Sequence, residues 1–214
     1  MGNPLTKLKA LLTEFSRSET PKGPSPAFTP VHLVKALLLL ESSSMGRQLM
    51  SKMLGLGEGS ARTLVKKLAE RELVSVDPVG GCNLTEEGRL IVNELRQTIL
   101  SSKEFTLEEF GIKLPSFAVQ VRGPSAFTIP VTKLRDVAVK NGAEGMLVFT
   151  VKDSKISLPM IVDDISRDYP RLVEMIRGSF SLRDGDFIFI GFAEDKNAAE
   201  HGALAAAIFC ILES

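Results

Sequence analysis

The chain has 214 residues, enough for one large domain or two small ones. Its residues are 44% hydrophobic and 24% charged, which is typical of a globular protein that can bury a core without disulfide bonds. Basic residues (Lys and Arg) and acidic residues (Asp and Glu) number 26 each, so the formal net charge is zero, which excludes a uniformly basic nucleic-acid coat protein but leaves room for a local basic face.

The first 30 residues are expected to form a leading helix and a proline-rich linker. Apolar side chains recur there at helical spacing and predict a short helix; they are Leu5, Leu8, Leu11, Leu12 and Phe15. Residues 16–30 contain four prolines, which remove backbone donors and block helix formation. We therefore expect an extended linker, or a strap over the next domain.

The next stretch carries the periodicity of three helices. The first, over Val31–Glu41, contains four consecutive leucines, which predicts a buried central helix. The second covers Gly46–Leu54. A glycine-rich turn follows, after which the Ser60 hydroxyl can cap a third helix that runs to about Glu72.

A two-stranded hairpin and a fourth helix come next. Short strands over Val74–Asp77 and Cys82–Thr85 flank a turn of proline and glycine. The helix begins at Thr85, has two glutamates in its first turn and runs to Leu100. This order of elements is that of a winged helix, so we expect residues 31–103 to form a winged helix-turn-helix domain.

The third helix is the candidate for reading DNA. Its apolar side chains form an inward stripe, and polar and basic side chains fall on the opposite face. Arginine and lysine in such a position can meet guanine and phosphate groups in the major groove. The candidate DNA-binding residues are Ser60, Arg62, Thr63, Lys66 and Lys67, and the last four are expected to face one surface.

Two observations favour other interpretations of this helix. Polar residues on an outward helical face are most often only a solvated face. The expected wing tip, residues 78–83, contains no lysine or arginine, and Glu58, Glu70 and Glu72 flank the reader. Winged helices with such features can bind protein in place of DNA.

Three runs of sequence carry a resemblance to a known family: FTPVHLVKALLLLE from Phe28, LGLGEGSARTLVKKL from Leu54 and LTEEGR from Leu84. The chain resembles an archaeal family of winged-helix proteins that are described as uncharacterised or as transcriptional regulators. The resemblance extends over nearly the whole chain. It implies a second, C-terminal α+β domain similar to the small GAD-type domain of some tRNA-handling proteins.

The C-terminal half has the pattern of a small α+β domain. Residues 101–115 are expected to be a connector, and the following elements favour a mixed sheet with helices on one face. We therefore expect an α+β fold class, with this domain over residues 116–214. The expected elements are a strand at Phe117–Arg122, a helix from Pro130 closed by Asn141 and Gly142, strands at Gly145–Val151 and Ile156–Met160, a helix beginning at Asp168 and Pro170, a strand at Phe187–Ala193 and a helix from Asn197 to about Leu212.

Charge and side-chain chemistry also distinguish the two halves. Residues 1–103 carry a net charge of +4 and residues 104–214 a net charge of −4, which predicts different partners. Acidic residues cluster in the second half and could hold Mg²⁺, although helix caps and solvated turns are the favoured interpretation; they are Asp163, Asp164, Asp168, Glu194 and Asp195. The run Arg122–Ser125 could cradle an anion, with a tight turn favoured.

Other features predict a reduced, cytoplasmic protein without catalytic machinery. Cys82 and Cys210 are far apart in sequence and are expected to be free thiols, with Cys210 buried and inert. The longest apolar run, Ala203–Leu212, is too short to span a membrane, and the first residues lack the apolar core of a signal sequence. No nucleotide-binding, hydrolase or zinc motif is present, and the lone His201 favours a structural role, so we expect no catalytic residues, cofactor or metal.

Our first hypothesis is a DNA-binding transcriptional regulator. The C-terminal domain would dimerise it, sense a small ligand, or do both. The small residues Gly202, Ala203, Ala206 and Ala207 would serve either self-association or packing within the domain. Two alternatives stay open. One is an enzyme in which the winged helix is an adaptor and the acidic C-terminal residues bind metal or substrate. The other is an adaptor linked to RNA or tRNA.

Overall fold

The computed structural model describes residues 6–16, 27–123 and 128–213, which fold into two compact units. The first unit is Met1–Leu95 and the second is Arg96–Ser214, so the division falls inside helix α5. Most of the expected proline-rich linker, and the end of the Arg122–Ser125 turn, lie outside the described residues.

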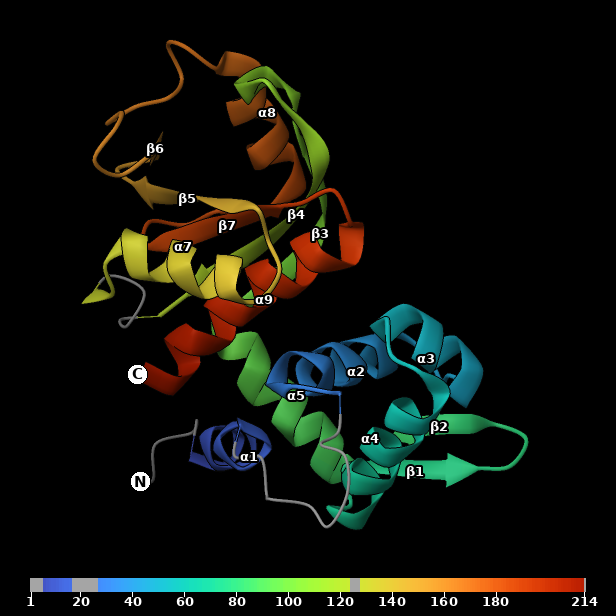
Figure 1. Ribbon diagram of the computed structural model, residues 1–214. Helices are drawn as coiled ribbons and strands as arrows, with labels where there is room; N and C mark the ends of the chain where they lie inside the picture. The colour runs from blue at the N-terminus through green and yellow to red at the C-terminus, as the bar shows by residue number, and fades with distance from the viewer. Residues whose placement is uncertain (1–5, 17–26, 124–127, 214) are drawn as a thin grey trace. The chain divides into compact units, whose positions relative to one another are not determined.

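The N-terminal unit is a winged helix-turn-helix preceded by one helix (Figure 1). The helices and the hairpin of this unit are the ones that the apolar periodicity and the turn glycines predict. The elements are α1 Thr6–Ser16, α2 Pro30–Ser42, α3 Arg47–Leu54, α4 Glu58–Glu70, β1 Val74–Asp77, β2 Gly81–Leu84 and α5 Glu86–Thr98.

A short bridge joins the α2–α3 connection to the wing. The Met45 amide donates to the Cys82 carbonyl at 3.1 Å, and the Cys82 amide donates to the Met45 carbonyl at 2.8 Å. Gly81 next to it has a φ of +77°, and a Cβ on this residue would lie 2.6 Å from the Met45 carbonyl oxygen. Only glycine therefore allows the wing to approach so closely.

Helix α1 is part of this unit and does not form a separate leading segment. Leu8 and Leu12 are fully buried, and the Glu94 carboxylate of α5 accepts a hydrogen bond from the Leu8 amide at 3.0 Å. The Phe15 ring packs on Phe28, with ring centroids 6.1 Å apart. The apolar stripe of α1 thus adds to the core of the winged helix.

The end of α4 is fixed by a Schellman motif. The Glu72 amide donates to the Ala69 carbonyl at 2.9 Å, and the Leu73 amide donates to the Leu68 carbonyl at 3.0 Å. Glu72 has a φ of +57°, at a position where glycine is usual. The chain turns sharply there and enters β1.

The start of α5 is fastened to that same turn. The Thr85 amide donates to the Leu73 carbonyl at 3.1 Å, and the Thr85 hydroxyl donates to the Glu72 carbonyl. The same hydroxyl oxygen accepts from the Gly88 amide at 3.0 Å and so caps α5, as the sequence predicts. A Cβ on Gly88 would lie 2.1 Å from the Leu73 carbonyl oxygen, which explains the glycine of the LTEEGR run.

The C-terminal unit is built on a five-stranded sheet in the order β3-β4-β7-β5-β6. Every pairing is antiparallel, so the expectation of a mixed sheet is wrong. The last strand inserts between β4 and β5, which run parallel to each other but are not neighbours. The elements are β3 Ile99–Leu107, η1 Glu108–Phe110, β4 Ile112–Arg122, α7 Val131–Lys140, β5 Gly145–Lys152, β6 Lys155–Ser157, α8 Pro170–Ser179, β7 Asp186–Phe192 and α9 Lys196–Glu213.

Helices cover both faces of this sheet, where one face was expected. Leu172 and Ile176 of α8 pack on one face, against side chains such as Ile188 and Ile190 of β7. Helix α9 packs on the other face with α7 beside it (Figure 1). The burial pattern of β7 is continuous for this reason, because both of its faces are covered.

The expected connector at residues 101–115 is also wrong. Strands β3 and β4 form an antiparallel pair there, with Glu104 opposite Phe117 and Phe105 opposite Ser116. Two register shifts interrupt the pairing, and Phe110 stacks on Tyr169 with ring centroids 4.2 Å apart. Phe105 and Phe110 of this segment pack against the core of the unit.

Small residues of α9 are used for packing within the unit. A Cβ on Gly202 would lie 2.5 Å from the Ala143 Cβ, and a Cβ on Gly191 of β7 would lie 2.6 Å from the Ala199 carbonyl oxygen. Gly202 and Ala203 therefore allow the close approach of α9 to its own neighbours. Cys210 is buried in the same helix, and this burial raises the pKa of its thiol to about 12.

Two helical glycines provide a test of the close contact between α5 and Leu73. We expect Gly88→Ala to lower the free energy of unfolding of the N-terminal unit by at least ~2 kcal/mol, because the added methyl group meets backbone. Gly59→Ala, also in the first turn of a helix but with open space around it, should be neutral or stabilise by about 0.5 kcal/mol. Urea unfolding followed by peptide-resolved labelling of the buried Cys82 thiol measures both. Equal effects of the two substitutions would contradict the contact.

Candidate nucleic-acid interface

Helix α4 starts earlier than the sequence predicts, which changes the place of one candidate DNA-binding residue. The helix begins at Glu58, and Gly57 occupies the N-cap position with a φ of −63°. Ser60 therefore lies in the first turn, half-buried, and is not the cap that the sequence suggests. Glu58 favours the earlier start, because a carboxylate in the first turn complements the helix dipole.

The outer face of α4 consists of Arg62, Thr63 and Lys66, whose side chains are exposed. The Thr63 hydroxyl donates to the Gly59 carbonyl at 2.9 Å, which holds the hydroxyl against the helix. Lys66 Nζ lies 3.7 Å from the Glu70 carboxylate, and its side chain is 75% exposed, so this ion pair contributes little to stability. Both cationic groups are thus available to an external anion.

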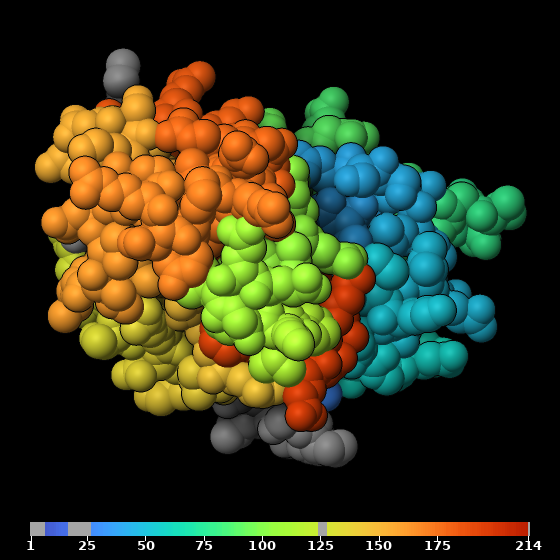
Figure 2. Space-filling model, turned by 90° about the horizontal axis from the view of Figure 1, so that it is seen from above, coloured from blue at the N-terminus to red at the C-terminus, as the bar shows by residue number. Residues whose placement is uncertain are grey.

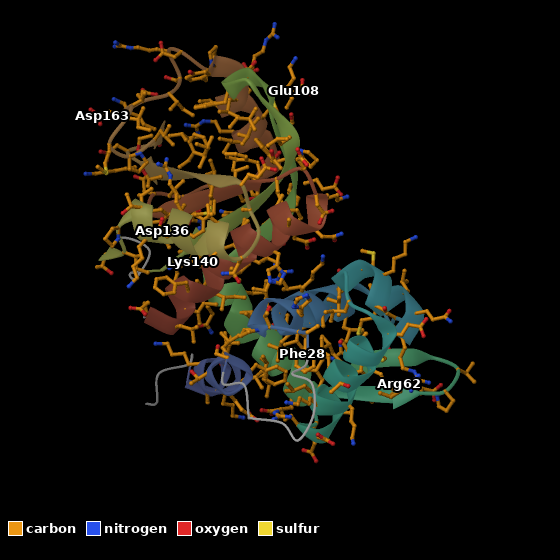
Figure 3. All side chains as sticks on the ribbon, in the orientation of Figure 1. Phe28, Arg62, Glu108, Asp136, Lys140 and Asp163 are labelled. Carbon is orange, nitrogen blue, oxygen red and sulfur yellow. The ribbon has the colours of Figure 1, made fainter. Side chains whose placement is uncertain are left out.

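Lys67 points in another direction, so it does not share one surface with Arg62, Thr63 and Lys66 as predicted. Its Nζ lies 5.7 Å from the centroid of the Phe28 ring and 5.9 Å from that of the Phe15 ring. In Figure 3, Phe28 lies among the helices of the unit, whereas Arg62 projects from α4. Lys67 therefore helps to hold α1 and the residues before α2, and it is not part of the outer face.

Two further residues lie close to this face and were missed in the sequence. Arg47 and Gln48, at the start of α3, line a hollow of about 180 Å³ together with Glu58 and Arg62 of α4. The helix-turn-helix pattern contained part of this signal, because α3 has only eight residues and the turn after it leads directly into α4.

The wing carries no basic side chain at its tip. The Asp77 carboxylate accepts hydrogen bonds from the Gly80 amide at 2.5 Å and the Val79 amide at 2.8 Å, and these bonds lower the pKa of Asp77. Val79 is 98% exposed. The wing is thus a rigid turn with an apolar tip, which lacks a cationic group for gripping phosphate.

Several acidic residues of the C-terminal unit accept hydrogen bonds in turns and helix caps. The Asp164 carboxylate accepts from the Ser166 amide at 2.9 Å, and the Asp195 carboxylate caps α9 by accepting from the Ala198 amide at 3.1 Å. Helix α8 is capped by Glu109, which accepts from the Leu172 amide at 3.0 Å, and not by Asp168. Within residues 6–16, 27–123 and 128–213, no group of three His, Cys, Asp or Glu side chains is placed to hold a metal ion. Figure 3 shows Asp163 at the outer edge of the unit.

A buried ion pair in the C-terminal unit was also missed. The Asp186 side chain is fully buried and accepts two hydrogen bonds from the Arg122 guanidinium, at 2.5 and 2.8 Å. Gln120 Nε2 and the Arg183 amide donate to it at 2.8 and 2.9 Å. Burial raises the pKa of Asp186, but these donors outweigh it and leave the pKa below its ordinary value. Arg122 is thus part of the sheet and its guanidinium is engaged.

The C-terminal unit also has a groove between β3 and α8. Two adjoining hollows of about 490 and 450 Å³ share Thr106 and Met175. Figure 2 shows this face, with the segment around η1 in light green next to the orange atoms of α8. Gly178 of α8 lines the groove and has open space where a Cβ would be.

Models of known protein families match parts of both units. Residues 32–90 match the PH0730-like N-terminal domain, and residues 112–211 match a domain of unknown function, DUF4443. No curated protein matches the chain. The expected GAD-like character of the second domain stays a prediction.

Solved structures give the same relationship. Hypothetical protein PH0730 from Pyrococcus horikoshii OT3 is 28% identical, with a TM-score of 0.72, over 85% of this chain and 92% of that chain. Lactococcus lactis ZitR is 21% identical, with a TM-score of 0.29, over 41% of this chain and 66% of that chain. This chain is therefore similar to PH0730 over most of the length of both proteins.

Substitutions of the adjacent residues Lys66 and Lys67 test which side of α4 faces outward. We expect Lys67→Ala to lower the free energy of unfolding by about 1 kcal/mol, because it removes a cation from two aromatic rings. Lys66→Ala should change it by less than about 0.5 kcal/mol, since the side chain is exposed. Chemical denaturation of the two variants makes the comparison. If Lys66→Ala lowered the free energy of unfolding more than Lys67→Ala, Lys67 and not Lys66 would be the lysine on the outer face.

Acid unfolding tests the buried Asp186 network. Because the folded-state pKa of Asp186 is lowered, its contribution to stability is complete above the ordinary pKa of about 4 and disappears as pH falls through the folded-state value. We expect Arg122→Ala to cost about 3 kcal/mol at pH 7, since it leaves a buried carboxylate without its cation. In Asp186→Asn, the free energy of unfolding should fall less steeply with pH below pH 4 than it does in the wild type.

Urea unfolding from pH 7 to pH 2 measures these effects, and Asp163→Asn is the control with the same change of charge at an exposed position. An acid profile of Asp186→Asn identical to that of the wild type would show that the network does not govern acid stability.

Proposed function

We propose that this protein is a DNA-binding transcriptional regulator that reads duplex DNA with α4. The observation that carries the proposal is the exposed face of Arg62, Thr63 and Lys66 on the third helix of a winged helix-turn-helix. The corresponding helix of such domains enters the major groove, and arginine and lysine are the side chains that meet guanine and phosphate there.

The dimensions of the helix and groove agree with this proposal. An α-helix with its side chains is about 10–12 Å wide, and the major groove is about 12 Å wide. The apolar side of α4 is occupied by the core, with Leu64 and Leu68 fully buried. The wing would add little affinity, because its tip offers no cation to phosphate.

We propose a binding role and no catalytic role, in a cytoplasmic protein. In the part of the chain that the structure describes, two of the clustered carboxylates act as a turn acceptor and a helix cap, namely Asp164 and Asp195. No described helix is both long enough and apolar enough to cross a bilayer.

We assign dimerisation and effector sensing to the C-terminal unit, also as a proposal. A regulator of this kind pairs so that its two reader helices meet half-sites about 34 Å apart. An effector would need space on the same unit, and the groove between β3 and α8 provides it. Gly178 favours this use of the groove, since a glycine in a helix costs stability and no neighbour here requires one.

Selection of genomic DNA fragments by the purified full-length protein, at near-physiological salt, tests the proposal. We expect an enriched motif with two-fold symmetry. Arg62→Ala with Lys66→Ala should weaken binding to it by about 100-fold or more, because each base contact contributes roughly 1–3 kcal/mol and each phosphate contact adds to affinity.

The control variant is Lys9→Ala with Arg89→Ala, which removes the same charge from α1 and α5. It should retain the motif and most of the affinity. No enrichment by the wild type, or equal losses in the two variants, would contradict the proposal. Binding to structured RNA in place of duplex DNA would instead favour the adaptor hypothesis.

A further inference from the structure

The hollow at the start of α4 brings together two groups of opposite charge. Glu58 is the first residue of the helix and Arg62 lies one turn later, and both side chains are exposed. Arg47 and Gln48 of α3 close the other side of the hollow. All four residues belong to the N-terminal unit.

Glu58 and Arg62 have the spacing and order that favour an ion pair on a helix. A glutamate four residues before a basic residue is the more stabilising arrangement, and the reverse order is weaker. Lys66 and Glu70, in the reverse order on the same helix, nevertheless pair at 3.7 Å. No ion pair or side-chain hydrogen bond joins Glu58 or Arg62 to any described residue, so both charged groups remain open to an outside partner.

A phosphate contact explains Arg62 but not Glu58, since a carboxylate repels phosphate. The edges of base pairs in the major groove offer another partner. The N4 amino group of cytosine is a donor that a carboxylate accepts, and guanine O6 and N7 accept the two donors of an arginine. A free carboxylate beside a free guanidinium therefore matches neighbouring cytosine and guanine better than it matches a backbone.

We propose that Glu58 and Arg62 are a base-reading pair, in which Glu58 accepts from cytosine N4 and Arg62 donates to guanine O6 and N7. The inference rests on the proposed function and specifies the DNA that it recognises. Four residues of helix rise by about 6 Å, and base pairs are about 3.4 Å apart. The half-site therefore contains a cytosine and a guanine within two base pairs of each other.

Selection from a random duplex library by the full chain tests the pair. The wild type should enrich a motif with these two bases. Glu58→Gln should lose the cytosine preference at one position by roughly 5–150-fold, with a shift toward adenine, which glutamine reads, and with the other positions unchanged. Arg62→Ala should relax the guanine position.

The matched control is Glu86→Gln, because Glu86 is an exposed glutamate in the first turn of α5, a helix of the same 13-residue length as α4. This variant should keep the wild-type motif. Two outcomes would overturn the base-reading pair while leaving the proposed function intact: an unchanged motif for Glu58→Gln, or a uniform gain of affinity for all sequences, which would mean that Glu58 only repels phosphate. A wild type that enriches no motif would overturn both.

Discussion

The orientation of α4 depends on one backbone contact, between the turn that ends this helix and the first turn of α5. The Leu73 carbonyl accepts from the Thr85 amide and lies where a Cβ on residue 88 would be. The contact is possible only because residue 88 is glycine, and the Thr85 side chain fastens the turn from the other side. The Leu-Thr-x-x-Gly run thus fixes the end of α4 against the start of α5.

The contact of Leu73 with Thr85 and Gly88, together with the Met45–Cys82 bridge, restricts the movement of α4 relative to the rest of its unit. Lys67 and Arg71 extend the arrangement by packing over the Phe15 ring, and Arg71 also pairs with Glu14 of α1. The basic residues of α4 are therefore divided in two. Those on the inner side hold α1 in place, and those on the outer side, Arg62 and Lys66, remain for a partner.

Much of the fold could be predicted from the sequence, because its signals are local. Helical periodicity, turn glycines and the Thr85 cap are each encoded within a few residues, and they define the winged helix. The β3–β4 hairpin could not be predicted in this way, since β3 is an edge strand whose polar residues and two register shifts hide any alternation. The strand order could not be predicted either, because β7 inserts between two strands that precede it in the chain.

The same distinction applies to the candidate site. Arg62, Thr63 and Lys66 follow from the position of α4 and its apolar stripe. Lys67 does not, because its direction depends on Phe15 and Phe28, which come from separate segments of the chain. The Arg122–Asp186 pair likewise requires the register of β4 on β7, which no short stretch of sequence contains.

The central claim is that the outer face of α4 lies in the major groove. Its most direct test is affinity cleavage of a selected DNA fragment by an iron chelate attached at Thr63→Cys. Cys82 and Cys210 are buried, so the introduced thiol can be labelled selectively, and wild-type protein treated in the same way is the control. We predict cleavage at the centre of each half-site from the tagged variant and none from the control. Retained binding without cleavage at the half-sites would contradict the account.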